Sequence, residues 1–199
     1  MRRALLAVAL AACAAPGCAG ARPVYLNRDV RTVAVLWPLN ASNFIEAPDR
    51  LWPYVEHEVQ SRGYALVPRA TVWGFYEAKR FTGEPGQINM FTAQELCREF
   101  KCDAVVYTNI AEWGANRKLT RTELKVAVEA YIVDGKDGQR CWEGAGEDKS
   151  STGGGFSVRG IVKDAILAQL RDLEPYGQRA AEKCFRKLPL PGYEPRDPK

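Results

Sequence analysis

Four cysteines in the body of the chain, Cys97, Cys102, Cys141 and Cys184, are the side chains whose spacing best suits chemistry. Cys97 and Cys102 are separated by four residues, which is compatible with a local disulfide or with two unpaired buried thiols. A zinc site would need a second cluster of ligands. The sequence contains one histidine and no such cluster, so we predict no metal. Four cysteines allow three disulfide connectivities, and the sequence does not select one of them.

Other candidates for catalysis have little support. His57 lies between Glu56 and Glu58 with no nucleophile or orienting group nearby in sequence, so we expect an exposed histidine on a helix. The glycines at 153–155 precede a predicted helix but lack the Lys-Ser/Thr pair of a phosphate-binding loop. No two carboxylates have the spacing of a paired acid and base. We therefore predict no catalytic residue, no cofactor and no enzymatic activity.

The first residues of the chain predict export and lipidation. Arg2 and Arg3 precede the apolar run 4–12, and Cys13 and Cys18 follow it. A positive start, a short apolar run and a cysteine are typical of a lipoprotein signal. The run is much shorter than the roughly 20 residues that span a bilayer. We therefore expect the mature protein to be held at a bacterial membrane through a lipid on one of these cysteines.

Two cysteines compete for the lipid. Cys13 follows Leu10 at the usual lipobox spacing but leaves a very short signal. Cys18 gives a normal signal length and leaves an even number of cysteines, as suits an oxidising compartment, although Pro16 is unusual there. We favour Cys18 and keep Cys13 open. Neither is followed by aspartate, which favours the outer membrane, facing the periplasm, with surface exposure left open.

Aromatic and polar residues near predicted strand ends are the candidates for binding. Trp37, Trp52 and Trp73 lie in or beside predicted loops, and tryptophan is enriched at protein interfaces. Local packing over the strand ends is the alternative. Asn40 and Ser42 are expected near the carboxyl ends of parallel strands, where α/β proteins bind ligands. These five residues form the predicted interface or cleft.

Hydrophobic patterns define the elements that must position these residues. Apolar or alternating runs predict strands at 32–36, 64–68, 103–110 (with an extension to Trp113 left open), 123–133 and 140–147. Proline, glycine and capping signals predict helices from Pro53 to Gly63, shortly after Ala70, from Thr92 to Lys101 and over 158–188, with a break at 175–177. The order β-α-β-α-β-β-β-α implies an α/β fold with a mixed sheet and covering helices. A Gly/Ser loop is expected at 150–157.

Length and charge limit the class of protein. A chain of 199 residues suits a signal (1–17), a tether (18–30), one α/β domain (31–188) and a flexible tail (189–199). Arg2 and Arg3 account for two units of the formal net charge of +4, and the other basic residues are spread among acidic ones. Binding to nucleic acid needs a basic patch or stripe, so we predict none.

The ordered motifs resemble a family of bacterial lipoproteins of undetermined function, typified by a meningococcal surface-antigen candidate. The resemblance covers roughly residues 30–188 and rests on the segments 33–40, 63–68, 83–85, 102–107, 110–114, 133–134 and 142–144. It implies a fold like the amino-terminal domain of TolB, shared with envelope lipoproteins of the curli-secretion and penicillin-binding-protein-activator types, which act by binding proteins. This chain differs at Trp37, where proline is usual, and at Cys102, where alanine or glycine is usual.

These observations favour a non-catalytic accessory or docking subunit of an envelope assembly, secretion or cell-wall complex. Its expected partners are the membrane, through the N-terminal lipid, and an envelope protein, with self-association also open. The alternative is a ligand-binding subunit of an envelope transport system. A hydrolase is disfavoured, because His57 has no accompanying nucleophile motif.

Overall fold

The computed structural model describes residues 29–81, 87–118, 121–153 and 173–192. The predicted signal, the candidate lipidation sites Cys13 and Cys18, nearly all of the tether and the end of the tail lie outside these ranges. Among the described helices, none is long and apolar enough to cross a membrane.

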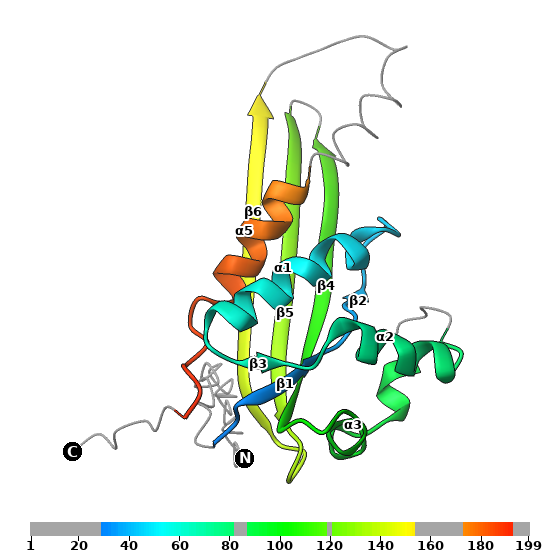
Figure 1. Cartoon of the computed structure of the whole chain (residues 1–199). Helices are drawn as coiled ribbons and strands as arrows, with labels where there is room; N and C mark the ends of the chain where they lie inside the picture. Colours follow the sequence, from blue (N-terminus) through cyan, green and yellow to red (C-terminus); the bar gives the residue numbers. More distant parts are fainter. Residues whose placement is uncertain (1–28, 82–86, 119–120, 154–172, 193–199) are drawn as a thin grey trace, which may run out of the picture.

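The described strands form one mixed sheet in which three long strands dominate (Figure 1). The strand order is β3-β1-β4-β5-β6, and β2 pairs with β4 beyond the end of β1. The pairs that involve β1, β2 or β3 are parallel, and the β4–β5 and β5–β6 pairs are antiparallel. The strand bounds are β1 Thr32–Val35, β2 Leu39–Asn40, β3 Ala65–Leu66, β4 Ala104–Lys118, β5 Arg121–Asp134 and β6 Arg140–Gly153.

Helices pack on both faces of the sheet. Helices α1 and α5 lie side by side across one face of the long strands, while α2 and α3 lie near the start of β4 (Figure 1). Successive side chains of β4 point to opposite faces of the sheet, so Tyr107 and Val106 lie on different faces. Tyr107 stacks on Tyr131 of β5 with ring centroids 5.0 Å apart. The helix bounds are α1 Ala47–Ser61, α2 Arg69–Ala78, the 3₁₀ helix η1 Gln87–Met90, α3 Ala93–Phe100 and α5 Glu174–Phe185. The predicted α/β class with a mixed, helix-covered sheet is confirmed.

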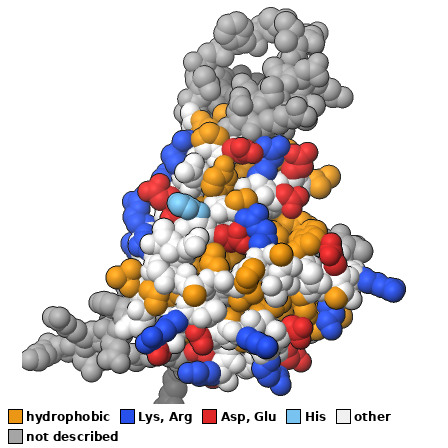
Figure 2. Space-filling view, viewed as in Figure 1, with side chains coloured by type: hydrophobic (Ala, Val, Ile, Leu, Met, Phe, Trp, Pro, Cys, Tyr) orange, Lys and Arg blue, Asp and Glu red, His pale blue; other side chains and the backbone are white. Residues whose placement is uncertain are grey.

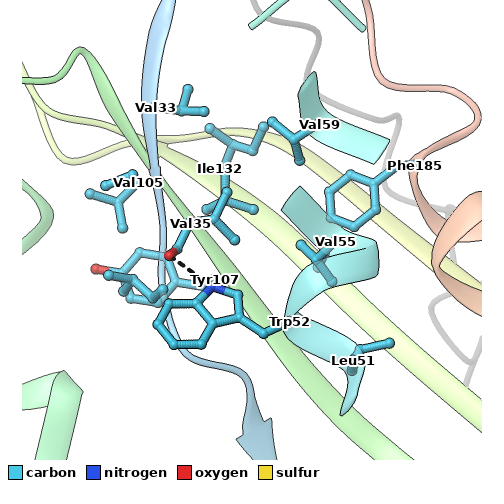
Figure 3. Close-up of a cluster of buried hydrophobic side chains, with 14 of the residues drawn as sticks. Val33, Val35, Leu51, Trp52, Val55, Val59, Val105, Tyr107, Ile132 and Phe185 are labelled. Atoms are coloured by element: carbon cyan, nitrogen blue, oxygen red, sulfur yellow. Dashed lines mark hydrogen bonds between the residues drawn. The ribbon is translucent and has the colours of Figure 1, made fainter. Parts of the chain in front are cut away.

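The core beneath α1 and α5 is apolar and continuous (Figure 3). Val33 and Val35 of β1 and Ile132 of β5 face α1, and Phe185 of α5 lies beside them. Trp142 of β6 stacks on Phe185 with ring centroids 5.3 Å apart. Two glycines of β6, Gly144 and Gly146, let α5 approach the sheet, because a Cβ at either would lie within 2.5 Å of the helix backbone.

Polar contacts also tie α5 to β6, the long strand at one edge of the sheet. Asp148 accepts hydrogen bonds from Arg179 at 2.7 Å and from Lys183 at 2.6 Å. The Lys183 ammonium also donates to the backbone carbonyl of Glu147 at 3.0 Å. Burial opposes ionisation of Asp148, but the hydrogen bonds from Lys183 and Arg179 outweigh it and lower its pKa.

The start of α1 differs from the prediction. The helix begins at Ala47 with Pro48 in its first turn, and Pro53 lies inside it. A proline in a helix interior costs about 3 kcal/mol, because it removes one hydrogen bond and crowds the preceding turn. The longer helix fully buries Leu51 and nearly all of Trp52. Burying two such side chains contributes roughly 1.5–3 kcal/mol each, which offsets that cost.

The ends of the long strands also differ from the prediction. The return strand was expected to end at Glu147, but β6 continues to Gly153, so 150–153 is strand rather than loop. Ser150 pairs with Leu124 of β5, and backbone pairing alone needs no hydrophobic alternation. Helix α5 begins at Glu174 with Pro175 in its first turn, where proline is tolerated, so the predicted interruption at 175–177 falls at the start of a helix. Residues 154–172, the rest of the predicted loop and the start of the predicted helix, lie outside the described ranges.

Candidate functional site

The three tryptophans predicted at an interface come together in space. Trp37 follows β1, Trp52 lies in α1 and Trp73 lies in α2. Ring centroids are 5.8 Å apart for Trp37 and Trp73 and 6.2 Å apart for Trp52 and Trp73. Tyr76 of α2 completes the group, with centroids 6.5 Å from Trp37 and 6.4 Å from Trp73. We call these four residues the tryptophan cluster.

Hydrogen bonds fix the orientation of the cluster. Trp37 donates its indole N–H to Asp49 Oδ1 at 3.1 Å, and Trp73 donates to Glu77 Oε1 at 2.8 Å. The Tyr76 hydroxyl accepts the backbone N–H of Trp37 at 3.2 Å. Burial raises the pKa of Tyr76, so this phenol stays neutral at physiological pH. The outer indoles are therefore held in defined positions beside two carboxylates.

The members of the tryptophan cluster differ in solvent exposure, which separates a buried, structural residue from an exposed pair. Trp52 is only 4% exposed, and its indole N–H donates to the Val35 carbonyl at 3.2 Å (Figure 3). Its position in a buried helix corrects the prediction that it lies in or beside a loop. Trp73 is 40% exposed and Trp37 is partly exposed. The Trp37–Trp73 pair is thus the part that a partner can reach.

The polar partners of the cluster were not predicted. Glu77 lies four residues after Trp73 on a helix, so the i,i+4 spacing was a usable signal. Asp49 lies twelve residues after Trp37, across a turn and the start of a helix, and no local pattern joins them. Tyr76 was not among the predicted residues, although it lies three residues after Trp73 on the same helix.

The other predicted polar residues, Asn40 and Ser42, hold a turn. Asn40 donates its amide to the Phe44 carbonyl at 2.8 Å and accepts from the Ser42 backbone N–H and hydroxyl at 3.0 and 2.6 Å. An open hollow of about 390 Å³ lies beside this turn. Phe44 and Trp113, which stack with centroids 6.2 Å apart, contribute to its lining. A ligand role for Asn40 and Ser42 stays a prediction.

The cysteines lie in two regions, and all four described ones are thiols in the structure. The Sγ atoms of Cys97 and Cys102 lie 3.7 Å apart. Cys141 donates to the Ile132 carbonyl at 3.4 Å, while Cys184 lies on α5 above the glycines of β6. Burial raises the pKa of Cys184 to about 12, so it stays a thiol. Pairing of Cys141 with Cys184 is one of the possibilities that the sequence leaves open, and it stays untested.

The surface offers no further chemical constellation in the part of the chain that the structure describes. His57 is exposed, as predicted, and blue and red side chains are interspersed over the face seen in Figure 2. Within the described ranges, no three His, Cys, Asp or Glu side chains gather so as to hold a metal ion.

The fold defines the class of protein. Lipoprotein GNA1162 from Neisseria meningitidis has a crystal structure similar to this chain, with a TM-score of 0.56 and 22% identity over 71% of this chain and 99% of that one. The LpoB C-terminal domain from Salmonella enterica is less similar, with a TM-score of 0.42 and 14% identity over 60% of this chain and 83% of that one. The likeness to GNA1162 shows that this chain shares its α/β fold.

The family follows from the sequence. The model of the family described as "Putative lipoprotein GNA1162-like" matches residues 24–181, and the chain belongs to that family. A relative described as "Putative lipoprotein NMB1124/NMB1162", from Neisseria meningitidis serogroup B, is 23% identical over 144 residues and 70% of this chain. The match spans 65% of that relative's own length. The resemblance inferred from the ordered motifs is confirmed.

Proposed function

We propose that this chain is a non-catalytic accessory lipoprotein that docks on a protein of the bacterial cell envelope through its tryptophan cluster. Membership of a lipoprotein family supports attachment to an envelope membrane. The observation that carries the docking role is Trp73, which is 40% exposed yet held by Glu77 and edge-on to Trp37. The proposed location is the outer membrane, facing the periplasm, with the domain on a tether after Cys18 or Cys13.

An ordered, exposed tryptophan suits binding for a physical reason. Association loses side-chain freedom, and each immobilised flexible side chain costs about 0.5–1.5 kcal/mol. Trp73 is already ordered by its hydrogen bond and by its ring contacts, so less of that cost remains. Tryptophans that become buried when a partner binds are also among the residues that contribute most to the binding energy of interfaces.

The chemistry beside the cluster indicates the kind of surface that fits it. Asp49 and Glu77 place two carboxylates next to the indole rings of Trp37 and Trp73. Both carboxylates lie on exposed positions. An apolar side chain flanked by lysine or arginine would contact the rings and the carboxylates together. We therefore propose a protein surface with that composition as the partner.

Site-specific photo-crosslinking in cells tests the docking role. A photoreactive amino acid replaces Trp37 in one variant and His57, an exposed residue of α1, in the matched control. We expect one defined envelope protein to be captured from position 37 and not from position 57. Adding Trp73→Ala to the position 37 variant should abolish that product. Equal products from both positions, or a product unaffected by Trp73→Ala, would contradict docking through the cluster.

Mass spectrometry of the mature N-terminus tests the anchor separately. A lipid-modified Cys18 is the expected result, and modification at Cys13 would move the tether boundary without affecting the domain. An unmodified amino terminus would refute the anchor.

A ligand-binding role in transport has one observation in its favour, the hollow of about 390 Å³ that Phe44 and Trp113 help to line. The hydrogen bonds of Asn40 and Ser42 within the turn count against it, because those groups already have partners. Thermal shift with a panel of small envelope solutes, repeated with Phe44→Ala, separates the two roles. A ligand that stabilises the parent chain and not the variant would favour transport.

A further inference from the structure

The end of α3 brings two thiols together through one residue of unusual conformation. In an unbroken helix, residues five apart point about 140° away from each other, so Cys97 and Cys102 would diverge. Lys101 instead adopts the left-handed conformation, with φ 52° and ψ 49°, and ends the helix. The Cys102 N–H then donates to the Cys97 carbonyl at 3.1 Å. The two Sγ atoms are left 3.7 Å apart.

The surroundings hold this pair in place. Cys97 is 6% exposed and lies against Gly135, where an added Cβ would fall 2.5 Å from both its Cβ and its Sγ. Cys102 is half-buried, and its Sγ lies 3.4 Å from the Ala104 carbonyl. The pair therefore joins the last turn of α3 to the first residues of β4, with one sulfur inside the fold and the other nearer the solvent.

We propose that Cys97 and Cys102 form a disulfide by exchange with a disulfide-bearing oxidant. The Cys102 thiolate attacks one sulfur of the oxidant's disulfide, forms a mixed disulfide and releases the first oxidant thiolate. The Cys97 thiol loses its proton and attacks the Cys102 sulfur, which releases the second thiolate. The chain loses two protons and two electrons, and the oxidant is reduced to two thiols. Oxidation in the cell rests on the export proposed above, whereas the chemistry of the purified protein does not.

Exposure and hydrogen bonding both select Cys102 as the attacking residue. Its sulfur is the more accessible of the two. A hydrogen bond from the Cys97 thiol lowers the pKa of Cys102, and the Ala34 backbone N–H acts in the same direction. The reacting sulfurs must close from 3.7 Å to about 2.05 Å, which side-chain rotation can supply because the backbone already turns back at Lys101.

Peptide mapping tests the proposal directly, because each of the four cysteines falls on its own tryptic peptide. Cleavage at lysine and arginine places Cys97 on 81–98, Cys102 on 102–117, Cys141 on 141–149 and Cys184 on 184–186. The reduced full-length lipoprotein in detergent is treated with oxidised glutathione, alkylated and digested. We expect the linked pair 81–98 with 102–117 to be the main product. Cys141→Ala, the matched control, should leave it unchanged.

Three results would overturn the proposal: no linked pair, linkage of Cys97 mainly to Cys141 or Cys184, or recovery of Cys97 in a disulfide from Cys102→Ala. In Cys102→Ala we expect Cys97 to be recovered alkylated, and circular dichroism reports whether that variant is folded. Because Cys102 is expected to attack, Cys97→Ala should instead accumulate glutathione on Cys102, which keeps the assignment testable if one variant misfolds. The same mapping on acid-quenched cells separates the two proposals. A Cys97–Cys102 disulfide in the purified protein, with both residues still thiols in cells, would support the disulfide proposal and count against export.

Discussion

The approach of α5 to β6 predicts that Gly146→Ala strongly destabilises the domain. A Cβ added at Gly146 would lie 2.0 Å from the Ala180 carbonyl oxygen and 2.4 Å from the Cys184 nitrogen. Both atoms belong to the helix backbone, so no side-chain rotation relieves the overlap. Ordinary contact begins at 3.4 Å, so α5 would have to move outward by about 1.4 Å.

That displacement sets the magnitude of the effect. A gap of about 0.5–1 Å already forfeits a quarter to a half of a dispersion contact. Phe185 would lose its stacking on Trp142, and Asp148 its short contacts with α5. Overpacking typically costs about 1–3 kcal/mol. We expect a loss near the upper end, about 3 kcal/mol, and a fall in Tm of about 10 °C for a domain of this size.

Thermal and urea unfolding, followed by circular dichroism, measure the effect. Gly74→Ala is the matched control, since nothing lies within 4 Å of a Cβ at that position on the exposed side of α2. Alanine inside a helix should stabilise it by about 0.5–1 kcal/mol. Replacing glycine with alanine is therefore expected to lower the free energy of unfolding at Gly146 and to raise it at Gly74. A free energy of unfolding for Gly146→Ala within about 0.5 kcal/mol of the parent would refute the packing argument.

Substitutions at three further positions test local contacts. Thr92→Ala removes the acceptor for the Glu95 N–H and should cost about 1 kcal/mol in urea unfolding, with Thr92→Ser retaining most of it. Trp52→Phe leaves the Val35 carbonyl without its indole donor and should cost about 2 kcal/mol by the same assay. The ion pairs of Asp148 contribute fully above its ordinary pKa of 3.8 and are lost as the pH falls through its lowered value, so Asp148→Asn should flatten the acid dependence of stability. An equally steep acid dependence in that variant would contradict this.

The parts of the fold that could be predicted are those with short-range signals. The Thr92–Glu95 capping box is formed in the structure as its spacing predicts. The hairpin of β5 and β6 has a local signal too, because the segment Asp-Gly-Lys-Asp-Gly at 134–138, between the two predicted strands, has the composition of a tight turn. Alternating apolar residues in 123–133 likewise fixed which face of β5 is buried.

Features that depend on distant partners could not be predicted. Pro48 and Pro53 both suit a first helical turn, and the choice depends on the burial of Leu51 by other elements. The extension of β6 rests on backbone pairing with β5, which leaves no hydrophobic pattern. The tryptophans were identifiable as interface candidates by type, but Asp49 and the burial of Trp52 emerge only when α1 packs on β1.

The contact between Lys183 and β6 has a consequence for how the sheet ends. An exposed edge strand offers unpaired backbone groups to any other extended chain, and fourteen residues of β6 lie at this edge. Lys183 donates a hydrogen bond to the Glu147 carbonyl. Together with Arg179, which binds Asp148, it places two cations beside this part of β6. A strand that paired with this edge would have to displace the Lys183 ammonium and would then lie next to its positive charge. The last helix thus places positive charge on the edge strand at this point, which disfavours pairing with another extended chain there.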